Sequence, residues 1–112
     1  DLSATRAFYC DGLGMDHVTS GEGRHALSFG RQKINLHLKG RELEPKARVP
    51  QPGSGDFCLI SDTPLEAWIA HLTAKGIAIE EMPSPRTGAT GPLRSIYLRD
   101  PDGNLVEISN LA

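Results

Sequence analysis

The first third of the chain shows two different patterns of apolar and polar positions. From Leu2 to Tyr9, apolar side chains recur at intervals of three and four residues, which predicts a helix ending near Gly12. Three short runs with alternating apolar and polar residues follow, at 15–20, 24–29 and 33–38, and glycines separate them. Alternation over short, turn-bounded runs is typical of β-strands. We therefore expect one helix followed by three strands.

A similar order recurs after the polar, proline-containing stretch 40–55, which we expect to be a linker. The expected elements beyond it are a strand (56–60), a helix (64–75), a short strand (77–80), a loop (82–92) and two strands (93–99 and 104–109). The two halves match if the first half lacks a leading strand. We predict a single α+β domain, 1–112, with a first module at 1–39, truncated at its start, and a second at 56–112.

Composition and charge exclude several classes of protein. The 112 residues carry 12 Lys and Arg against 14 Asp and Glu, and a net charge of −2 provides no field for binding nucleic acid. No apolar run approaches the roughly 20 residues of a membrane span, and no basic-then-apolar signal peptide is seen. Cys10 and Cys58 lack a CxxC spacing, so we expect reduced core residues in a cytoplasmic protein.

Every predicted strand has one apolar face and one face with polar side chains. The polar faces carry Lys33, Asn35 and His37; Asp56 and Cys58; Ser95, Tyr97 and Arg99; and Glu107 and Ser109. A sheet with a solvated back is the simpler interpretation. The mixture of Cys, Tyr, Leu and Ile with acidic residues and histidine instead favours a partly dry cavity. One histidine and two carboxylates are the ligand types of a divalent metal site.

Each candidate ligand also has a structural alternative. Glu107 equally fits an exposed strand residue without a functional role, although its neighbours Val106 and Ile108 are apolar. His37 fits a half-exposed strand histidine, and Asp56 fits the end of a strand, since Asp is disfavoured in strand interiors. The three residues are too widely spaced to form a motif by spacing alone.

Three strings resemble a known family. They are 8–15 (FYCDGLGM), 33–37 (KINLH) and 97–109 (YLRDPDGNLVEIS), and they are similar to the vicinal oxygen chelate superfamily. That superfamily includes lactoylglutathione lyase, bleomycin-resistance proteins, fosfomycin-resistance enzymes and extradiol dioxygenases. The strings 56–60 and 86–92 resemble more narrowly the subgroup named glyoxalase-domain-containing protein five.

The resemblance implies two βαβββ modules whose mixed and antiparallel sheets curl into a cup around one metal ion. Glu107 then matches the C-terminal glutamate ligand, and Asp56 stands where many members have His or Gln. Either Asn35 or His37 matches the ligand of the first module, and we favour His37 because imidazole binds borderline metals better than a neutral amide. The remaining ligand would lie on the missing leading strand.

The implied function is that of a metal-dependent lyase, isomerase or dioxygenase acting on a small oxygenated metabolite. A divalent ion (Zn, Ni, Mn or Fe) would act as the Lewis acid and Glu107 as the general base. Lys33, Arg86 and Arg99 would bind an anionic group, and Tyr97 would donate to an oxygen. We expect a homodimer. The alternatives are a metal-free protein that sequesters a ligand, as bleomycin-resistance proteins do, and an incomplete fragment without activity of its own.

Overall fold

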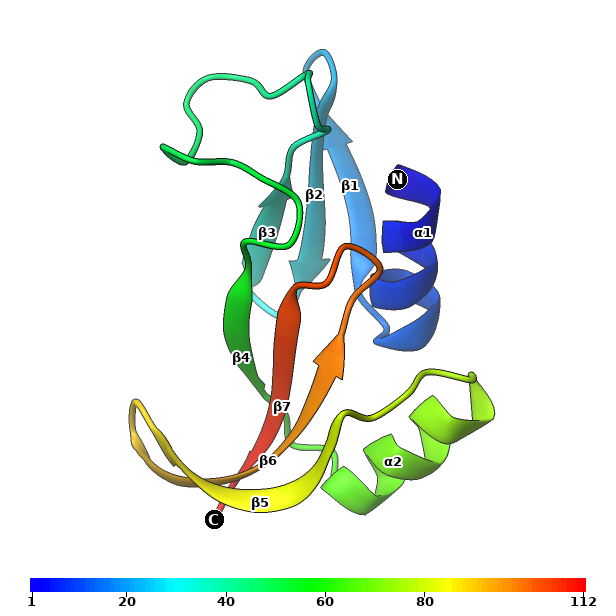
Figure 1. The fold of residues 1–112 in the computed structure, drawn as a ribbon, viewed down its shortest axis with the longest axis vertical. Coiled ribbons are helices and arrows are strands. Elements are labelled where there is room, and N and C mark those ends of the chain that lie inside the picture. The colour runs from blue at the N-terminus through cyan, green and yellow to red at the C-terminus, as the bar shows by residue number, and fades with distance from the viewer. The chain divides into compact units, whose positions relative to one another are not determined.

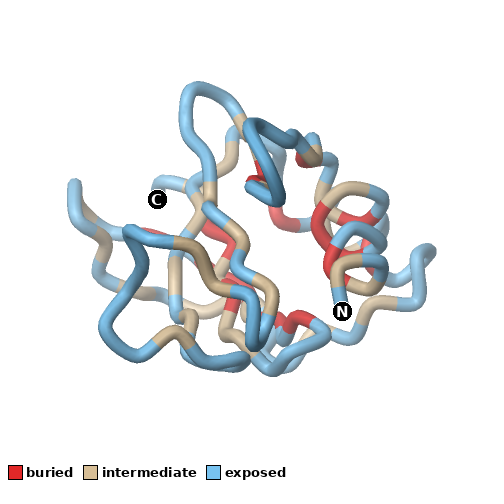
Figure 2. Tube along the Cα trace, turned by 90° about the horizontal axis from the view of Figure 1, so that it is seen from above, coloured by how far each residue is buried: buried red, intermediate tan, exposed pale blue.

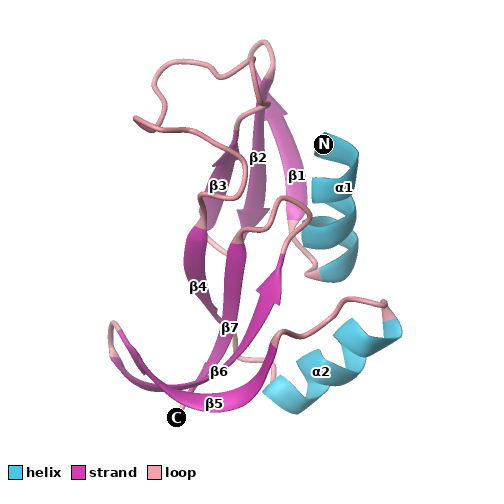
Figure 3. Ribbon diagram, viewed as in Figure 1, coloured by secondary structure: helices cyan, strands magenta, loops and turns pink.

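A computed structural model of the chain describes residues 1–112, which divide into two compact units, Asp1–Pro52 and Gly53–Ala112 (Figure 1). Each unit contains one sheet and one helical segment (Figure 3). The first sheet has three strands and the second has four.

The first unit begins with a helical segment, as the sequence predicts. The α-helix α1 (Leu2–Arg6) continues directly into a π-helical segment, η1 (Ala7–Gly12). The carboxylate of Asp1 caps the N-terminus, because its Oδ1 accepts hydrogen bonds from the backbone N–H groups of Ser3 (2.8 Å) and Ala4 (3.2 Å). The capped segment then runs along β1, as Figure 1 shows.

Three antiparallel strands complete this unit: β1 (Asp16–Ser20), β2 (Arg24–Phe29) and β3 (Gln32–Leu36). The three predicted strands are confirmed, but β3 ends earlier than expected. His37 and Leu38 lie beyond it, because the chain turns at Gly40, whose φ of +81° suits a residue without a Cβ. The middle strand, β2, pairs with both neighbours, so β3 is hydrogen-bonded to a strand on one side only.

The second unit contains a mixed four-stranded sheet and one helix. Its elements are β4 (Asp56–Ile60), α2 (Leu65–Ala74), β5 (Glu81–Gly88), β6 (Gly91–Arg99) and β7 (Leu105–Leu111). The strand order is β4-β7-β6-β5, with β4 parallel to β7 and the other pairs antiparallel. Asn110 of β7 caps the start of α2, since its Oδ1 accepts a 2.8 Å hydrogen bond from the N–H of Leu65.

The expectation of a short strand at 77–80 and a loop at 82–92 is wrong. Residues 77–80 form no strand, and β5 runs through Pro83 and Pro85. This strand is the outer edge of the sheet, where a residue without an N–H is tolerated. A register irregularity between Glu81 and Ser84 accompanies the prolines. The prolines therefore mark an edge strand rather than a loop.

The apolar faces of the strands form the buried parts of the structure, as the alternation predicts. In the second unit the fully buried apolar side chains are Leu65, Leu72, Ile96, Leu98, Val106 and Ile108. Figure 2 shows further buried positions on the N-terminal helical segment, where Phe8 and Tyr9 lie edge to face. The prediction that both cysteines are core residues is wrong: both are free, Cys10 is half-buried and Cys58 is exposed on β4. No helix is both long and apolar enough to cross a membrane.

Candidate functional site

One face of the second sheet collects most of the predicted site residues. Glu107 of β7 is the register partner of Tyr97 on β6 and of Cys58 on β4. Register partners in adjacent strands point to the same side of a sheet, so these three side chains share one face. One step further along, Ser95 pairs with Ser109 on the same face. The strands therefore bring together residues that lie far apart in the sequence.

Two buried serines hold the carboxylate of Glu107. Ser95 Oγ donates to Glu107 Oε2 at 2.7 Å, and Ser109 Oγ donates to the same oxygen at 3.3 Å. The two hydroxyls are also 2.7 Å apart, and neither serine has any exposed surface. Cys58 Sγ lies 3.2 Å from Ser109 Oγ and extends this network to β4.

Ser95 and Ser109 both stand in the predicted polar rows, but neither is among the site residues expected from the sequence. The signal was present in the strand alternation, which places Ser95 two residues from Tyr97 and Ser109 two residues from Glu107. A serine is common on any strand surface, so the alternation alone does not reveal that these two are buried.

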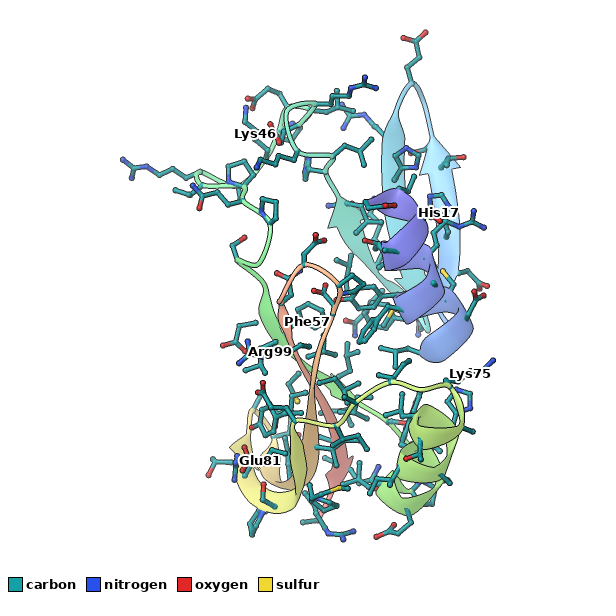
Figure 4. The ribbon with its side chains drawn as sticks, turned by 45° about the vertical axis from the view of Figure 1, so that its right-hand side comes forward. His17, Lys46, Phe57, Lys75, Glu81 and Arg99 are labelled. Atoms are coloured by element: carbon teal, nitrogen blue, oxygen red, sulfur yellow. The ribbon has the colours of Figure 1, made fainter.

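No lysine or arginine neutralises Glu107. The other three glutamates of this unit each pair with an arginine: Glu81 with Arg86 (2.7 Å), Glu80 with Arg99 (3.0 Å) and Glu66 with Arg94 (2.7 Å). Figure 4 labels Glu81 and Arg99 among the side chains of this unit. Glu107 is half-buried, and its hydrogen-bond partners are hydroxyl groups and the thiol of Cys58 rather than cations. A partly desolvated carboxylate without a cation partner has its charge available for a metal ion.

Tyr97 and Arg86 form a supported pair beside Glu107. Arg86 Nε donates a 3.0 Å hydrogen bond to the Tyr97 hydroxyl, and the guanidinium carbon lies 5.2 Å from the ring centre. Partial burial raises the pKa of Tyr97, and the nearby Glu107 carboxylate raises it further. The hydrogen bond to Tyr97 and the ion pair with Glu81 raise the pKa of Arg86. Tyr97 therefore remains protonated and able to donate.

Asp56 lies on the same face, at the first position of β4. Leu105 is its register partner, and Arg99 of β6 lies opposite Leu105. The ion pair with Glu80 raises the pKa of Arg99, and the charge of Asp56 adds to this effect. Arg99 is therefore already engaged with acidic groups of its own unit.

The remaining predicted residues lie in the first unit. Lys33 and Asn35 lie on the same face of β3, and His37 is the first residue after the strand. Asn35 is the second position on its face after the β2–β3 turn, as Glu107 is after the β6–β7 turn. The Nδ1 of His37 accepts a long hydrogen bond of 3.4 Å from the N–H of Leu43. Both ligand alternatives stay open.

Within neither unit do three or more His, Cys, Asp or Glu side chains come together in an arrangement that could hold a metal ion. The predicted set takes His37 from the first unit and Asp56 and Glu107 from the second. That His37, Asp56 and Glu107 bind one metal ion together stays a prediction.

Known proteins resemble the chain along nearly its whole length. Virulence protein STM3117 of Salmonella typhimurium is 53% identical over 109 residues, covering 97% of this chain and 76% of that protein. Its crystal structure matches with a TM-score of 0.96 over 100% of this chain and 89% of that one. The glyoxalase domain-containing protein RDO1 of Mycosarcoma maydis is 54% identical over 110 residues, covering 98% of this chain and 62% of that protein.

A solved structure that carries an enzyme name is less similar to the chain. The structure of lactoylglutathione lyase from Agrobacterium tumefaciens is 30% identical, with a TM-score of 0.71 over 98% of this chain and 85% of that one. The family model of the Glyoxalase/Bleomycin resistance protein/Dioxygenase superfamily matches residues 1–108. The expected α+β fold of the vicinal oxygen chelate type is confirmed. The chain belongs to the Glyoxalase/Bleomycin resistance protein/Dioxygenase superfamily.

Proposed function

We propose that the protein is a metal-dependent enzyme, a lyase, isomerase or dioxygenase of the glyoxalase type, that acts on a small oxygenated metabolite. The observation that carries this proposal is the carboxylate of Glu107, which is half-buried, fixed by two serines and paired with no cation. The 30% identity to a lactoylglutathione lyase supports the reaction class.

Glu107, Asp56 and His37 are the proposed ligands, with Asn35 as the alternative to His37. Carboxylates and imidazole suit Zn, Ni, Mn or Fe, and the donor set does not choose among these ions. When bound, a divalent ion supplies Lewis acidity toward oxygen atoms of the substrate.

The chain's own residues supply the remaining functions. Glu107 acts as the general base, since a carboxylate held by hydrogen bonds can accept a proton from a carbon or oxygen next to it. Ser95 and Ser109 fix its Oε2, which limits the directions from which the base can act. The Tyr97 hydroxyl, kept protonated, donates to a substrate oxygen.

Among the proposed substrate-binding cations, Lys33 differs from the two arginines. Arg86 and Arg99 each form an ion pair with a glutamate, whereas Lys33 forms none. We assign Lys33 to direct contact with an anionic group, and Arg86 to orienting Tyr97. We also propose that the protein functions as a homodimer, as is common among proteins of this superfamily.

Thermal melting in the presence of each metal tests the proposal. A ligand that binds only the folded protein raises the melting temperature by mass action. We expect one or more of Zn, Ni, Mn and Fe to raise the melting temperature of the wild type and not that of Glu107→Gln. The control is Glu66→Gln, which removes an exposed carboxylate of the same unit that pairs with Arg94 and should retain the metal effect. An unchanged melting temperature with every metal, combined with retained ligand affinity in Glu107→Gln, would instead indicate a metal-free binding protein.

A further inference from the structure

A basic hollow lies within the first unit. It has a volume of about 170 Å³ and lies between β2, β3 and the loop after β3. Its charged lining residues are Arg24, Lys33 and Arg41, and two histidines, His25 and His37, also line it. No aspartate or glutamate is part of the lining.

The three cations are not neutralised within the chain. Ion pairs in the structure involve Lys46, Arg86, Arg94 and Arg99, and none involves Arg24, Lys33 or Arg41. Arg24 donates instead to a backbone carbonyl, that of Glu44, at 3.0 Å. The lining of the hollow therefore carries positive charge without an ion-paired carboxylate, which raises the local concentration of anions.

Local hydrogen bonds explain why the nearby glutamates do not fill the hollow. Glu42 accepts a 2.7 Å hydrogen bond from the N–H of Gly40, and Glu44 pairs with Lys46, which Figure 4 labels on this loop. The carbonyl of Glu44 binds Arg24, which ties the loop to β2. The carboxylates of Glu42 and Glu44 are therefore bound to other groups of the loop, and neither residue lines the hollow.

We propose that this hollow binds an oxyanion, the carboxylate or phosphate-type group of a small molecule. Two guanidinium groups and an ammonium group supply charge-assisted donors, and guanidinium groups match two oxygens of one anion at once. A volume of about 170 Å³ accommodates a charged group rather than a whole drug-sized ligand, whose pockets start at about 300 Å³. This assignment deepens the proposed function. It rests on that function in one respect, that the bound anion is the charged end of the substrate.

Titration with simple anions tests the proposal. Inorganic phosphate and acetate are added separately to the purified protein at constant ionic strength, and chemical shifts of backbone amides around β2 and β3 are followed. We expect saturable binding of at least one anion, with the tighter of the two identifying the class of substrate group. Replacing one cation, as in Arg24→Gln, Lys33→Gln or Arg41→Gln, should weaken binding by about tenfold, the effect of one charge-assisted hydrogen bond.

Matched variants separate this site from general charge and from the metal proposal. Arg31→Gln removes a cation of the same unit that does not line the hollow, and it should leave anion affinity unchanged. Glu107→Gln should also leave it unchanged, even where metal binding is lost. Absence of saturable binding by either anion, or an equal loss in Arg31→Gln, overturns the proposal.

Discussion

The hydroxyl of Ser95 donates a 2.7 Å hydrogen bond to the carboxylate of Glu107, across the antiparallel pair β6 and β7. Both residues lie on the polar face of the second sheet, and Ser95 is completely buried. The bond fixes one carboxylate oxygen without neutralising its charge. Glu107 is therefore oriented by hydrogen bonds and is not paired with a cation.

Ser95→Ala should weaken metal binding, because groups that orient a metal ligand typically contribute about 10- to 100-fold to affinity. Loss of the bond should also lower the free energy of unfolding by about 1 kcal/mol. Competition with a chromophoric chelator measures the affinity, and urea denaturation measures the stability. Ser84→Ala is the matched control, since Ser84 is the register partner of Ser95 and its buried hydroxyl has no hydrogen-bond partner. Equal affinities for wild type and Ser95→Ala would contradict the positioning role.

The ligand contributed by the first unit can be identified by comparing His37→Ala with Asn35→Ala. Imidazole is the better donor to borderline metals, so His37→Ala should lower metal affinity by about tenfold or more, while Asn35→Ala should change it little. Isothermal titration of each variant with Zn and Ni measures the difference. The opposite ranking would assign the ligand position to Asn35, which is the second residue on its face after the β2–β3 turn, as Glu107 is after the β6–β7 turn.

Asp100 should be the most sensitive position of the β6–β7 turn. Its Oδ1 accepts hydrogen bonds from the N–H groups of Asp102 (3.0 Å) and Asn104 (2.8 Å), and its Oδ2 accepts one from the side chain of Asn104 (2.7 Å). Asp100→Ala should lower the free energy of unfolding by about 2 kcal/mol, because a buried acceptor to several donors is removed. Asp102→Ala, at an exposed position two residues away, should cost about 0.5 kcal/mol or less in the same urea titration.

The stability of the first unit should depend on pH through His17. Figure 4 labels this residue in the first unit, and its Nε2 lies 3.0 Å from Nδ1 of His25. Desolvation lowers the pKa of His17 below its ordinary value of 6.5, and the charges of Arg6 and His25 lower it further. Between the lowered pKa and 6.5 the unfolded chain binds more protons than the folded chain. The contribution to stability is therefore complete above pH 6.5 and is lost as the pH falls through this window.

His17→Gln should reduce this dependence. Urea denaturation between about pH 5 and pH 7.5 should show a smaller rise in the free energy of unfolding for the variant than for the wild type. His71→Gln, which changes a histidine of α2 outside this pair, should retain the wild-type slope. An identical slope in wild type and His17→Gln would exclude His17 as its source.

The elements with strong alternation or turn chemistry could be predicted from the sequence. The strand with Glu107 and the preceding turn are examples, because alternation and Gly103 (φ +87°) are local signals. The edge strand β5 could not be predicted, because Pro83 and Pro85 disfavour central strands and only the finished sheet shows which strand is the edge.

The side-chain ion pairs between neighbouring segments were harder to predict from the sequence. The ion pairs of Arg86 with Glu81 and of Arg99 with Glu80 depend on the β5–β6 register and on the chain just before β5, which the sequence does not encode as a local pattern. From the sequence alone, both arginines are therefore expected to bind an anionic group of the substrate. Only Lys33, of the three predicted cations, is unpaired in the structure.

The metal content of the purified protein tests the central claim most directly. Wild type and Glu107→Gln are purified without chelators, dialysed against Zn, Ni, Mn and Fe in turn, and analysed by inductively coupled plasma mass spectrometry. The account predicts that the wild type retains a stoichiometric amount of at least one of these ions and that Glu107→Gln does not. Equal metal content in the two proteins, or none in either, would contradict it.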